Sequence, residues 1–208
     1  MDGQYYHKGF IRMCWDNLFR LVCFNLLFIV CCLPVLTIPA ALTALNRTCQ
    51  NMLYGEKTTV RQFFHSFREN IISALPIGLL FAFGSAALIY GCLFYYNLSQ
   101  GRGVAIVAAI FCLVCVYILY CMGIYAFAML ARVELKTVCI IRNAFILTFR
   151  QTSLVKSWGV LSFALLAAFV YCFPYSTPVL CLLGFSLPCF AASRGALPII
   201  DDLIVRSD

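Results

Sequence analysis

Charged side chains are scarce in this sequence of 208 residues. Asp, Glu, Lys and Arg make up 11% of the chain, against 63% hydrophobic residues, whereas soluble domains carry about 25% charged residues. A soluble fold of this length would have to expose a large apolar patch. The composition therefore predicts an integral membrane protein with a single transmembrane domain over residues 1–208, because the length leaves no room for a second folded domain.

Groups that could carry chemistry inside a membrane are also lacking. The two histidines, His7 and His65, and all eight carboxylates lie outside the apolar runs. The sequence has no HExxH, P-loop or GxSxG motif. Most of the thirteen cysteines lie within apolar runs, including the CxxC of Cys112 and Cys115, and there we expect them to pack as small hydrophobes. We therefore expect no catalytic residue, no metal, no cofactor and no enzymatic activity.

Long apolar runs are what the chain does have. Five of them are near the roughly 17–25 residues that a helix needs to cross hydrocarbon: residues 18–36, 71–97, 104–131, 158–174 and 176–193. A sixth stretch, residues 37–53, is shorter and more polar. It is either a short crossing helix or a re-entrant half-helix.

The distribution of basic residues favours six crossings. If residues 37–53 cross and the N-terminus is cytoplasmic, fourteen of the fifteen Lys and Arg residues face the cytoplasm and only Arg102 lies outside. Cytoplasmic loops carry such an excess. We predict an all-α bundle of about six transmembrane helices arranged as three hairpins, with both termini cytoplasmic. The net charge of +7 then reflects topology and attraction to anionic lipid, and we expect no nucleic-acid partner.

A weak repeat introduces the three predicted hairpins. Each outward-going helix follows a basic, aromatic stretch that ends in a Phe-Arg pair, at residues 19–20, 67–68 and 149–150. Such stretches are typical of short amphipathic segments along the inner membrane surface. The pattern indicates either internal duplication, as in some transporters, or only the positive-inside rule. The basic segments 55–70 and 132–157 are candidate docking surfaces, with the residues Arg61, Phe67, Arg68, Arg142, Phe149 and Arg150.

A turn flanked by prolines separates the first two predicted helices. Pro34 and Pro39 enclose Thr37, small residues follow, and the helix ends in Asn46 and Arg47. Proline frees backbone carbonyls that could bind a ligand. The alternative, which we favour, is a tight hairpin whose second helix packs closely through its small residues. Asn25, in the middle of the first helix, is predicted to form a hydrogen bond to another helix.

Several of these residues also carry a family resemblance. Residues 15–75 include Trp-Asp-Asn-Leu-Phe at 15–19 before an apolar helix, the Leu-Pro-Val-Leu-Thr-Ile-Pro-Ala-Ala run at 33–41, Tyr54-Gly55-Glu56 and the Phe-Phe-His-Ser-Phe-Arg-Glu-Asn run at 63–70. This region resembles the YesL-like family of bacterial membrane proteins, although the family's Gly before the second proline is missing. The family has no known function. The resemblance implies association with carbohydrate-uptake operons of Gram-positive bacteria, and it supplies no catalytic residue.

Together these observations predict a non-enzymatic protein of the bacterial cytoplasmic membrane. We expect it to act beside a sugar ABC transporter as an accessory or regulatory component, with transporter subunits or a second copy of itself as partners within the lipid bilayer. The alternative is a small autonomous transporter or channel for a small solute. A membrane enzyme is the least favoured class.

Overall fold

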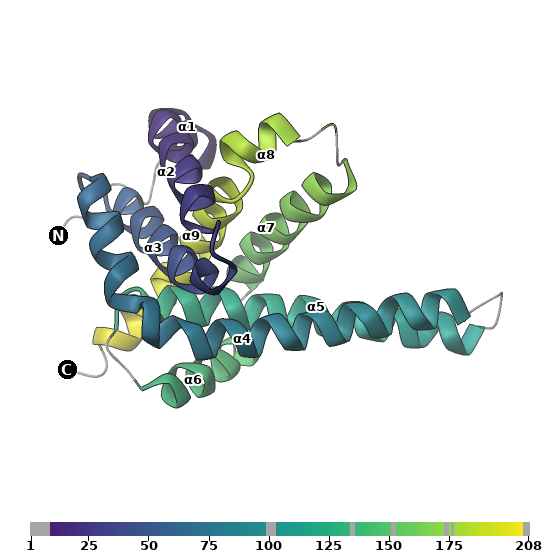
Figure 1. The fold of residues 1–208 in the computed structure, drawn as a ribbon. Helices are drawn as coiled ribbons and strands as arrows, with labels where there is room; N and C mark the ends of the chain where they lie inside the picture. Colours follow the sequence, from purple (N-terminus) through teal and green to yellow (C-terminus); the bar gives the residue numbers. More distant parts are fainter. Residues whose placement is uncertain are drawn as a thin grey trace.

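The computed structural model describes residues 9–98, 103–133, 136–150, 153–172, 175 and 177–205, and within them the chain is α-helical with no β-strand. The helices are α1 (Phe10–Asp16), α2 (Leu18–Cys31), the 3-10 helix η2 (Val35–Thr37), α3 (Ile38–Leu53), α4 (Val60–Leu98), α5 (Gly103–Leu130), α6 (Thr137–Arg150), α7 (Ser153–Tyr171), α8 (Thr177–Leu183) and α9 (Ser186–Val205). Figure 1 shows their arrangement.

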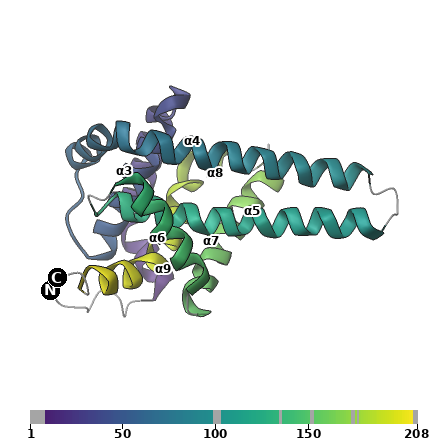
Figure 2. The ribbon, with the colours of Figure 1, turned by 90° about the horizontal axis from the view of Figure 1, so that it is seen from below.

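The two longest helices, α4 and α5, form a hairpin that projects well beyond the other helices (Figures 1 and 2). Their 39 and 28 residues correspond to about 58 and 42 Å of helix, longer than the roughly 30 Å of a hydrocarbon core. α4 contains Pro76 and changes direction in its first half (Figure 1). A proline bends a helix because it removes one backbone hydrogen bond and its ring displaces the preceding turn.

The described helices are compatible with a multi-pass membrane protein. Two of them, α4 and α5, are long and apolar enough to span a membrane, and up to four spans result if each of two bent pairs counts as one. The bent pairs are α1 with α2, at 72°, and α8 with α9, at 47°. The apolar composition of these helices indicates a membrane protein.

α3 is largely buried among the other helices. Eleven of its 16 residues are buried, and it contacts α2, α4, α5 and α9. Small side chains make this burial possible, because Ala40, Ala41 and Ala44 are at most 1% exposed and let neighbouring backbones approach closely. α3 packs against α4 so tightly that a Cβ on Gly78 would overlap the ring of Pro39. The helix that follows the proline-flanked turn therefore packs closely on α4.

The last apolar run, residues 176–193, was predicted as one helix, and this prediction is wrong. The helix is interrupted at Gly184 and Phe185, and the two parts differ in direction. Asn25 of α2 holds the interruption: its amide nitrogen donates to the carbonyls of Leu180 and Cys181, at 3.1 and 2.7 Å. Its carbonyl oxygen accepts from the backbone N–H groups of Phe185 and Ser186, at 3.0 and 2.9 Å.

One fully buried amide thus satisfies both ends of a broken helix, and the predicted interhelical role of Asn25 is confirmed. Irregular backbone is tolerated at membrane depth only where such partners exist.

The other predicted boundaries need smaller corrections. The first run, 18–36, ends as a helix at Cys31, since Pro34 and the 3-10 turn follow. The second, 37–53, begins at Ile38. The third, 71–97, lies within the longer helix α4, and the fourth, 104–131, agrees with α5 to within one residue at each end. Run 158–174 corresponds to α7, which ends at Tyr171. The proposed surface segment 55–70 is not separate, because α4 runs without interruption from Val60.

Candidate functional site

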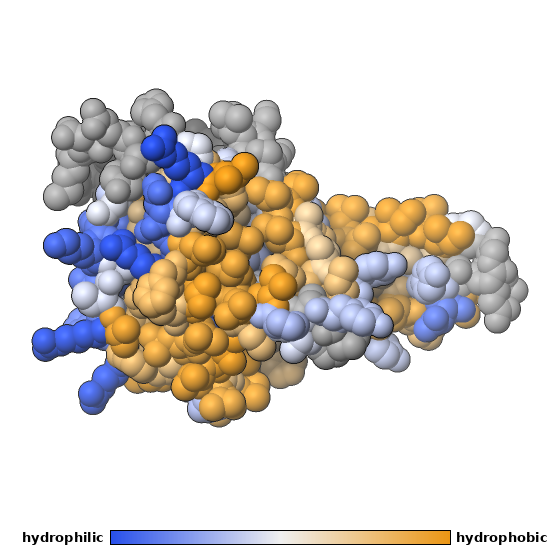
Figure 3. Space-filling view, turned by 90° about the horizontal axis from the view of Figure 1, so that it is seen from above, coloured by the Kyte–Doolittle hydropathy of each residue, from blue (hydrophilic) through white to orange (hydrophobic). Residues whose placement is uncertain are grey.

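Polar side chains gather at one end of the molecule, opposite the tip of the α4–α5 hairpin, while apolar side chains cover most of the remaining visible surface (Figure 3). Two cavities at this polar end lie on either side of Arg47. Because Arg47 lines both cavities, we treat them as one candidate site.

A sharp turn between α3 and α4 builds the first cavity. Gly55 has a φ of 77°, a left-handed conformation that glycine adopts without steric cost. The N–H of Gly55 donates to Met52 O and that of Glu56 to Asn51 O, at 3.1 and 2.9 Å. These bonds close the end of α3 and return the chain towards α4.

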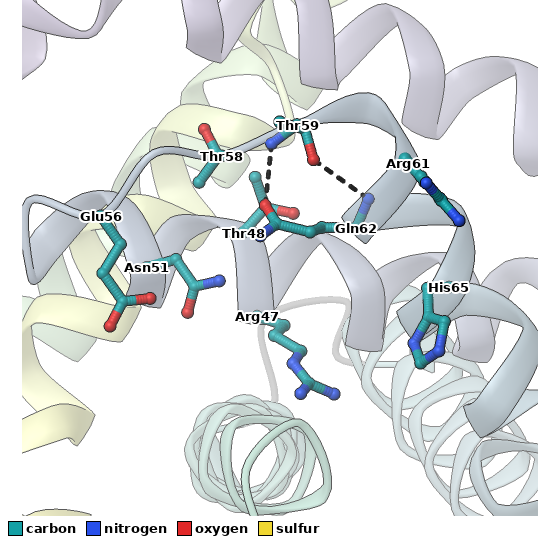
Figure 4. Close-up of a pocket in the computed structure, with 9 residues that line it drawn as sticks. All are labelled: Arg47, Thr48, Asn51, Glu56, Thr58, Thr59, Arg61, Gln62 and His65. Carbon is teal, nitrogen blue, oxygen red and sulfur yellow. Dashed lines mark hydrogen bonds between the residues drawn. The ribbon is translucent and has the colours of Figure 1, made fainter.

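The first turn of α4 is capped by its own side chains. The backbone N–H of Gln62 donates to the Thr59 hydroxyl, at 3.3 Å, and the Thr59 N–H donates to the Gln62 side-chain oxygen, at 3.0 Å (Figure 4). This reciprocal pair is a capping box. It fixes the start of α4, and with it the direction of Arg61 and His65, against the end of α3.

The α3–α4 cavity encloses about 460 Å³, and polar residues line it (Figure 4). They are Arg47, Thr48, Asn51, Glu56, Thr58, Thr59, Arg61, Gln62 and His65. Positions 47 and 51 on α3, and 61 and 65 on α4, are each four residues apart, so each pair shares one face of its helix. The cavity is therefore the space between two polar helix faces.

The α4–α5 cavity, of about 570 Å³, lies on the other side of Arg47. Its lining residues are Arg47, Glu69, Asn70, Ser73, Leu130, Ala131, Arg132, Val133 and Lys136. Arg132 is held in place, since its guanidinium lies 4.2 Å from the centre of the Tyr54 ring and donates to the Tyr54 hydroxyl at 3.0 Å. Cation–π contacts of this kind orient an arginine as well as stabilising it.

An ion-paired group separates the two cavities. Glu69 lies 3.5 Å from Arg47 Nη1 and 3.2 Å from His65 Nδ1. The Arg47 and Glu69 side chains are about half exposed, at 46% and 51%, so the pair contributes no more than about 1 kcal/mol to stability. Its effect is positional, because it ties α3 to α4 between the cavities.

The residues predicted as a functional hairpin do not form one site. Thr37 Oγ1 lies 2.6 Å from both Cys31 O and Pro34 O, so its hydroxyl caps the end of α2. Pro39 packs on Gly78. Arg47 is eight residues further along α3, or roughly 12 Å, and of this set it alone lines the polar cavities.

Asn46, the remaining member, faces the interior. It is 5% exposed, and its amide donates to Leu42 O at 3.0 Å and accepts from Ser193 Oγ at 3.5 Å. It lines a smaller cavity of about 190 Å³, whose other walls include Tyr120 and Pro188. Tyr120 is bound to Ser162 Oγ at 2.6 Å, and Ser162 donates to Pro188 O at 2.8 Å. This chain of hydrogen bonds joins α5, α7 and α9.

The predicted docking residues are divided between two helices. Arg61 lines the α3–α4 cavity, Arg68 is exposed and Phe67 is partly buried. On α6, Arg142 is exposed and Phe149 is 60% exposed. The side chain of Arg150 lies outside the described part of the structure.

Sequence analysis missed the uncharged members of the α3–α4 cavity. Thr48, Asn51, Thr58, Thr59 and Gln62 line it, whereas the sequence placed the first two in the short helix 37–53 and the last three in the docking segment 55–70. The Thr-x-x-Gln spacing at 59–62 is a recognisable helix-start signal and could have placed the start of α4. Nothing in the sequence gives the distance between that start and the end of α3.

Among the thirteen cysteines, Cys49 of α3 and Cys189 of α9 have side chains in contact. All thirteen are free thiols, and the described part of the chain holds no group of three or more His, Cys, Asp or Glu placed to bind a metal ion.

Residues 21–98 match the family model described as "Protein of unknown function, DUF624". The matched segment runs from α2 to the end of α4 and thus contains the whole α3–α4 cavity. This match agrees with the YesL-like resemblance. No curated protein and no solved structure matches the chain significantly.

Proposed function

We propose that this protein, whose residues 21–98 match the DUF624 family model, is a non-enzymatic, multi-pass protein of the bacterial cytoplasmic membrane. It acts through a partner, as an accessory or regulatory component of carbohydrate uptake by an ABC-type transporter. The observation that carries the proposal is the concentration of polar side chains at one end of an otherwise apolar surface (Figure 3). The YesL-like resemblance of residues 15–75 supports the link to sugar uptake.

The proposed topology has six crossings, with the polar end and both termini in the cytoplasm. The excess of Lys and Arg supports it. In this topology α3 crosses without touching much lipid, because eleven of its residues are buried among its neighbours. Reporter fusions test the topology: a periplasm-dependent reporter should be active after residue 98 and inactive after residue 56 and at the C-terminus. Activity after residue 56 contradicts six crossings.

Exposed basic residues next to the polar cavities form the proposed docking surface. Arg68 on α4 and Arg142 on α6 are exposed, and exposed arginines favour an acidic partner surface and accelerate encounter with it. The site of docking is then the outer face of this end rather than its cavities.

Recovery of partners at native expression tests the proposal. The tagged protein, isolated in mild detergent, should bring transporter subunits with it in stoichiometric amounts. The variant Arg68→Gln/Arg142→Gln should recover several-fold less, whereas Arg12→Gln/Arg20→Gln, which removes two exposed charges from α1 and α2, serves as a charge-matched control. Deleting the gene should change sugar uptake only when the transporter is present. An unchanged uptake rate, or isolation of the protein alone, would contradict the accessory role.

The interrupted α8–α9 helix favours a second candidate function, a small autonomous transporter. Transporters place substrate sites at broken helices near the middle of the membrane, and Pro188 and Phe185 beside this break line the 190 Å³ cavity with Asn46 and Tyr120. Purified protein in liposomes that moves a sugar without a partner would establish this function. Asn46→Leu should then reduce the flux.

A further inference from the structure

The α3–α4 cavity has the size and composition of a small-molecule site. Ligand pockets are usually about 300–1,000 Å³, and this one encloses about 460 Å³. Unlike the usual pocket it is lined by hydroxyl, amide and charged groups (Figure 4). A ligand that fits it must therefore be polar over most of its surface.

The charges of the lining favour an anion. Arg47 and Arg61 enter from two different helices, and His65 lies beside them, against a single lining carboxylate, Glu56. Arg47 shares its charge with Glu69. No carboxylate pairs with Arg61 within the described part of the chain. Arg61 is therefore the cationic group most available to a ligand.

The start of α4 adds backbone donors to these cations. Val60 and Arg61 are the first two residues of a 39-residue helix, and the first N–H groups of a helix have no partner within it. These groups and the helix dipole favour a negative charge. The capping box of Thr59 and Gln62 holds this helix start at the cavity wall.

The remaining lining residues suit hydroxyl groups. The Asn51 amide offers both donors and an acceptor, while the Gln62 amide nitrogen offers donors, since its oxygen accepts from the Thr59 N–H. The Thr48 hydroxyl donates to Ala44 O and offers only an acceptor, and Thr58 carries a buried hydroxyl that has no hydrogen-bond partner in the described structure. Planar guanidinium groups bind phosphate oxygens with good geometry. The combination of two arginines, a helix start and neutral hydrogen-bonding groups is complementary to a phosphate joined to a hydroxylated group.

We propose that the α3–α4 cavity binds the phosphate ester of a polyol, with Arg61, Arg47 and the first turn of α4 on the phosphate and with Asn51 and Gln62 on the hydroxyl groups. Two sources present this chemistry at the polar end of a membrane protein: the headgroup of a glycerol-bearing anionic lipid and a soluble organophosphate. The proposal goes beyond the accessory function and does not depend on a partner protein.

The test uses the full chain in nanodiscs and two matched variants. Arg61→Gln removes a cavity charge, whereas Arg20→Gln, on α2, removes an exposed charge outside the cavity. In phosphatidylcholine nanodiscs, titration calorimetry with glycerol phosphate measures the soluble source. In discs of equal parts phosphatidylcholine and phosphatidylglycerol, native mass spectrometry of the released protein counts retained phosphatidylglycerol.

A soluble source gives glycerol phosphate binding that weakens about tenfold in Arg61→Gln, as expected for the loss of one charge-assisted contact, and is unchanged in Arg20→Gln. A lipid source gives retained phosphatidylglycerol that is lost in Arg61→Gln and kept in Arg20→Gln. Asn51→Ala should weaken the same ligand by a smaller factor. If neither ligand binds the wild-type chain, or if both arginine variants lose it equally, the proposal is wrong.

Discussion

The helices α3 and α5 differ in how the polarity of their side chains relates to their burial. α3 carries Thr43, Asn46, Thr48 and Gln50, yet all four are buried. α5 is the more apolar of the two, yet only seven of its 28 residues are buried, and six of these lie at the end next to the polar cavities. The helix that is richer in polar groups is inside, and the more apolar helix is outside.

This difference follows from the solvent that each helix meets. Because lipid solvates the apolar surface of α5, burying that surface within the protein would add little stability. The polar groups of α3 would be costly in lipid, and most of them are bonded inside instead, although the Gln50 side-chain oxygen has no hydrogen-bond partner in the described structure. The hydroxyls of Thr43 and Thr48 donate to the carbonyls four residues before them, and the Gln50 amide donates to Ala128 O of α5 at 3.1 Å.

Truncation of two phenylalanines on α4 should show the largest contrast between the packed and projecting regions. Phe63 is 1% exposed and Phe83 is 73% exposed. Phe63→Ala should cost about 3–5 kcal/mol through the cavity it leaves, while Phe83→Ala should cost little because lipid or detergent fills the space. Thermal unfolding in mild detergent measures both. Equal losses of stability would show that the projecting hairpin is packed against protein.

Substituting two glycines of α4 tests the same difference between the packed and the projecting region. A Cβ at Gly78 would overlap Pro39, whereas a Cβ at Gly91 would meet only Cys112 Sγ, at 3.6 Å. Gly78→Ala should therefore cost up to about 3 kcal/mol by overpacking. Gly91→Ala should stabilise the helix by about 0.5–1 kcal/mol. The same unfolding assay decides, and a tolerated Gly78→Ala would contradict the close approach of α3 and α4.

Removal of the Asn25 side chain tests the joint between α2 and the broken helix. Asn25→Leu removes the hydrogen bonds to the Cys181 carbonyl and to two N–H groups of the α8–α9 break, while Leu180 O still accepts from the Gly184 N–H. We expect a loss of about 2 kcal/mol. Leu26→Ala, at a 46% exposed neighbour, is the control. Faster amide exchange at Phe185 and Ser186 in the Asn25 variant alone would locate the effect. Unchanged exchange there would refute the assignment.

The Tyr120–Ser162 contact should give the smallest effect. Hydrogen bonds between membrane helices average about 0.6 kcal/mol, so Tyr120→Phe should lower stability by about that much. The double variant with Ser162→Ala should then cost less than the sum of the two single changes. Strict additivity would mean that the 2.6 Å contact contributes nothing.

Hydropathy predicted where the helices lie but not how each one is interrupted or joined. The apolar runs located α4 and α5 because these runs are long and strongly apolar. The break at Gly184 was missed, since the run around it stays apolar while its stabilising partner is Asn25, more than 150 residues away. Arg47 and Arg61 were identified as notable residues, but their shared cavity depends on the turn at Gly55, whose geometry apolar periodicity does not reveal.

The bond network of Asn25 also has a consequence for biosynthesis. Its partners Leu180 and Cys181 follow it by 155 and 156 residues, and at 5–20 residues per second they are made roughly 8–30 s later. During that interval α2 carries the Asn25 amide, whose final hydrogen-bond partners have not yet been synthesised. α2 therefore reaches its final packing only after α8 and the start of α9 have been synthesised, so the two ends of the chain complete their folding together.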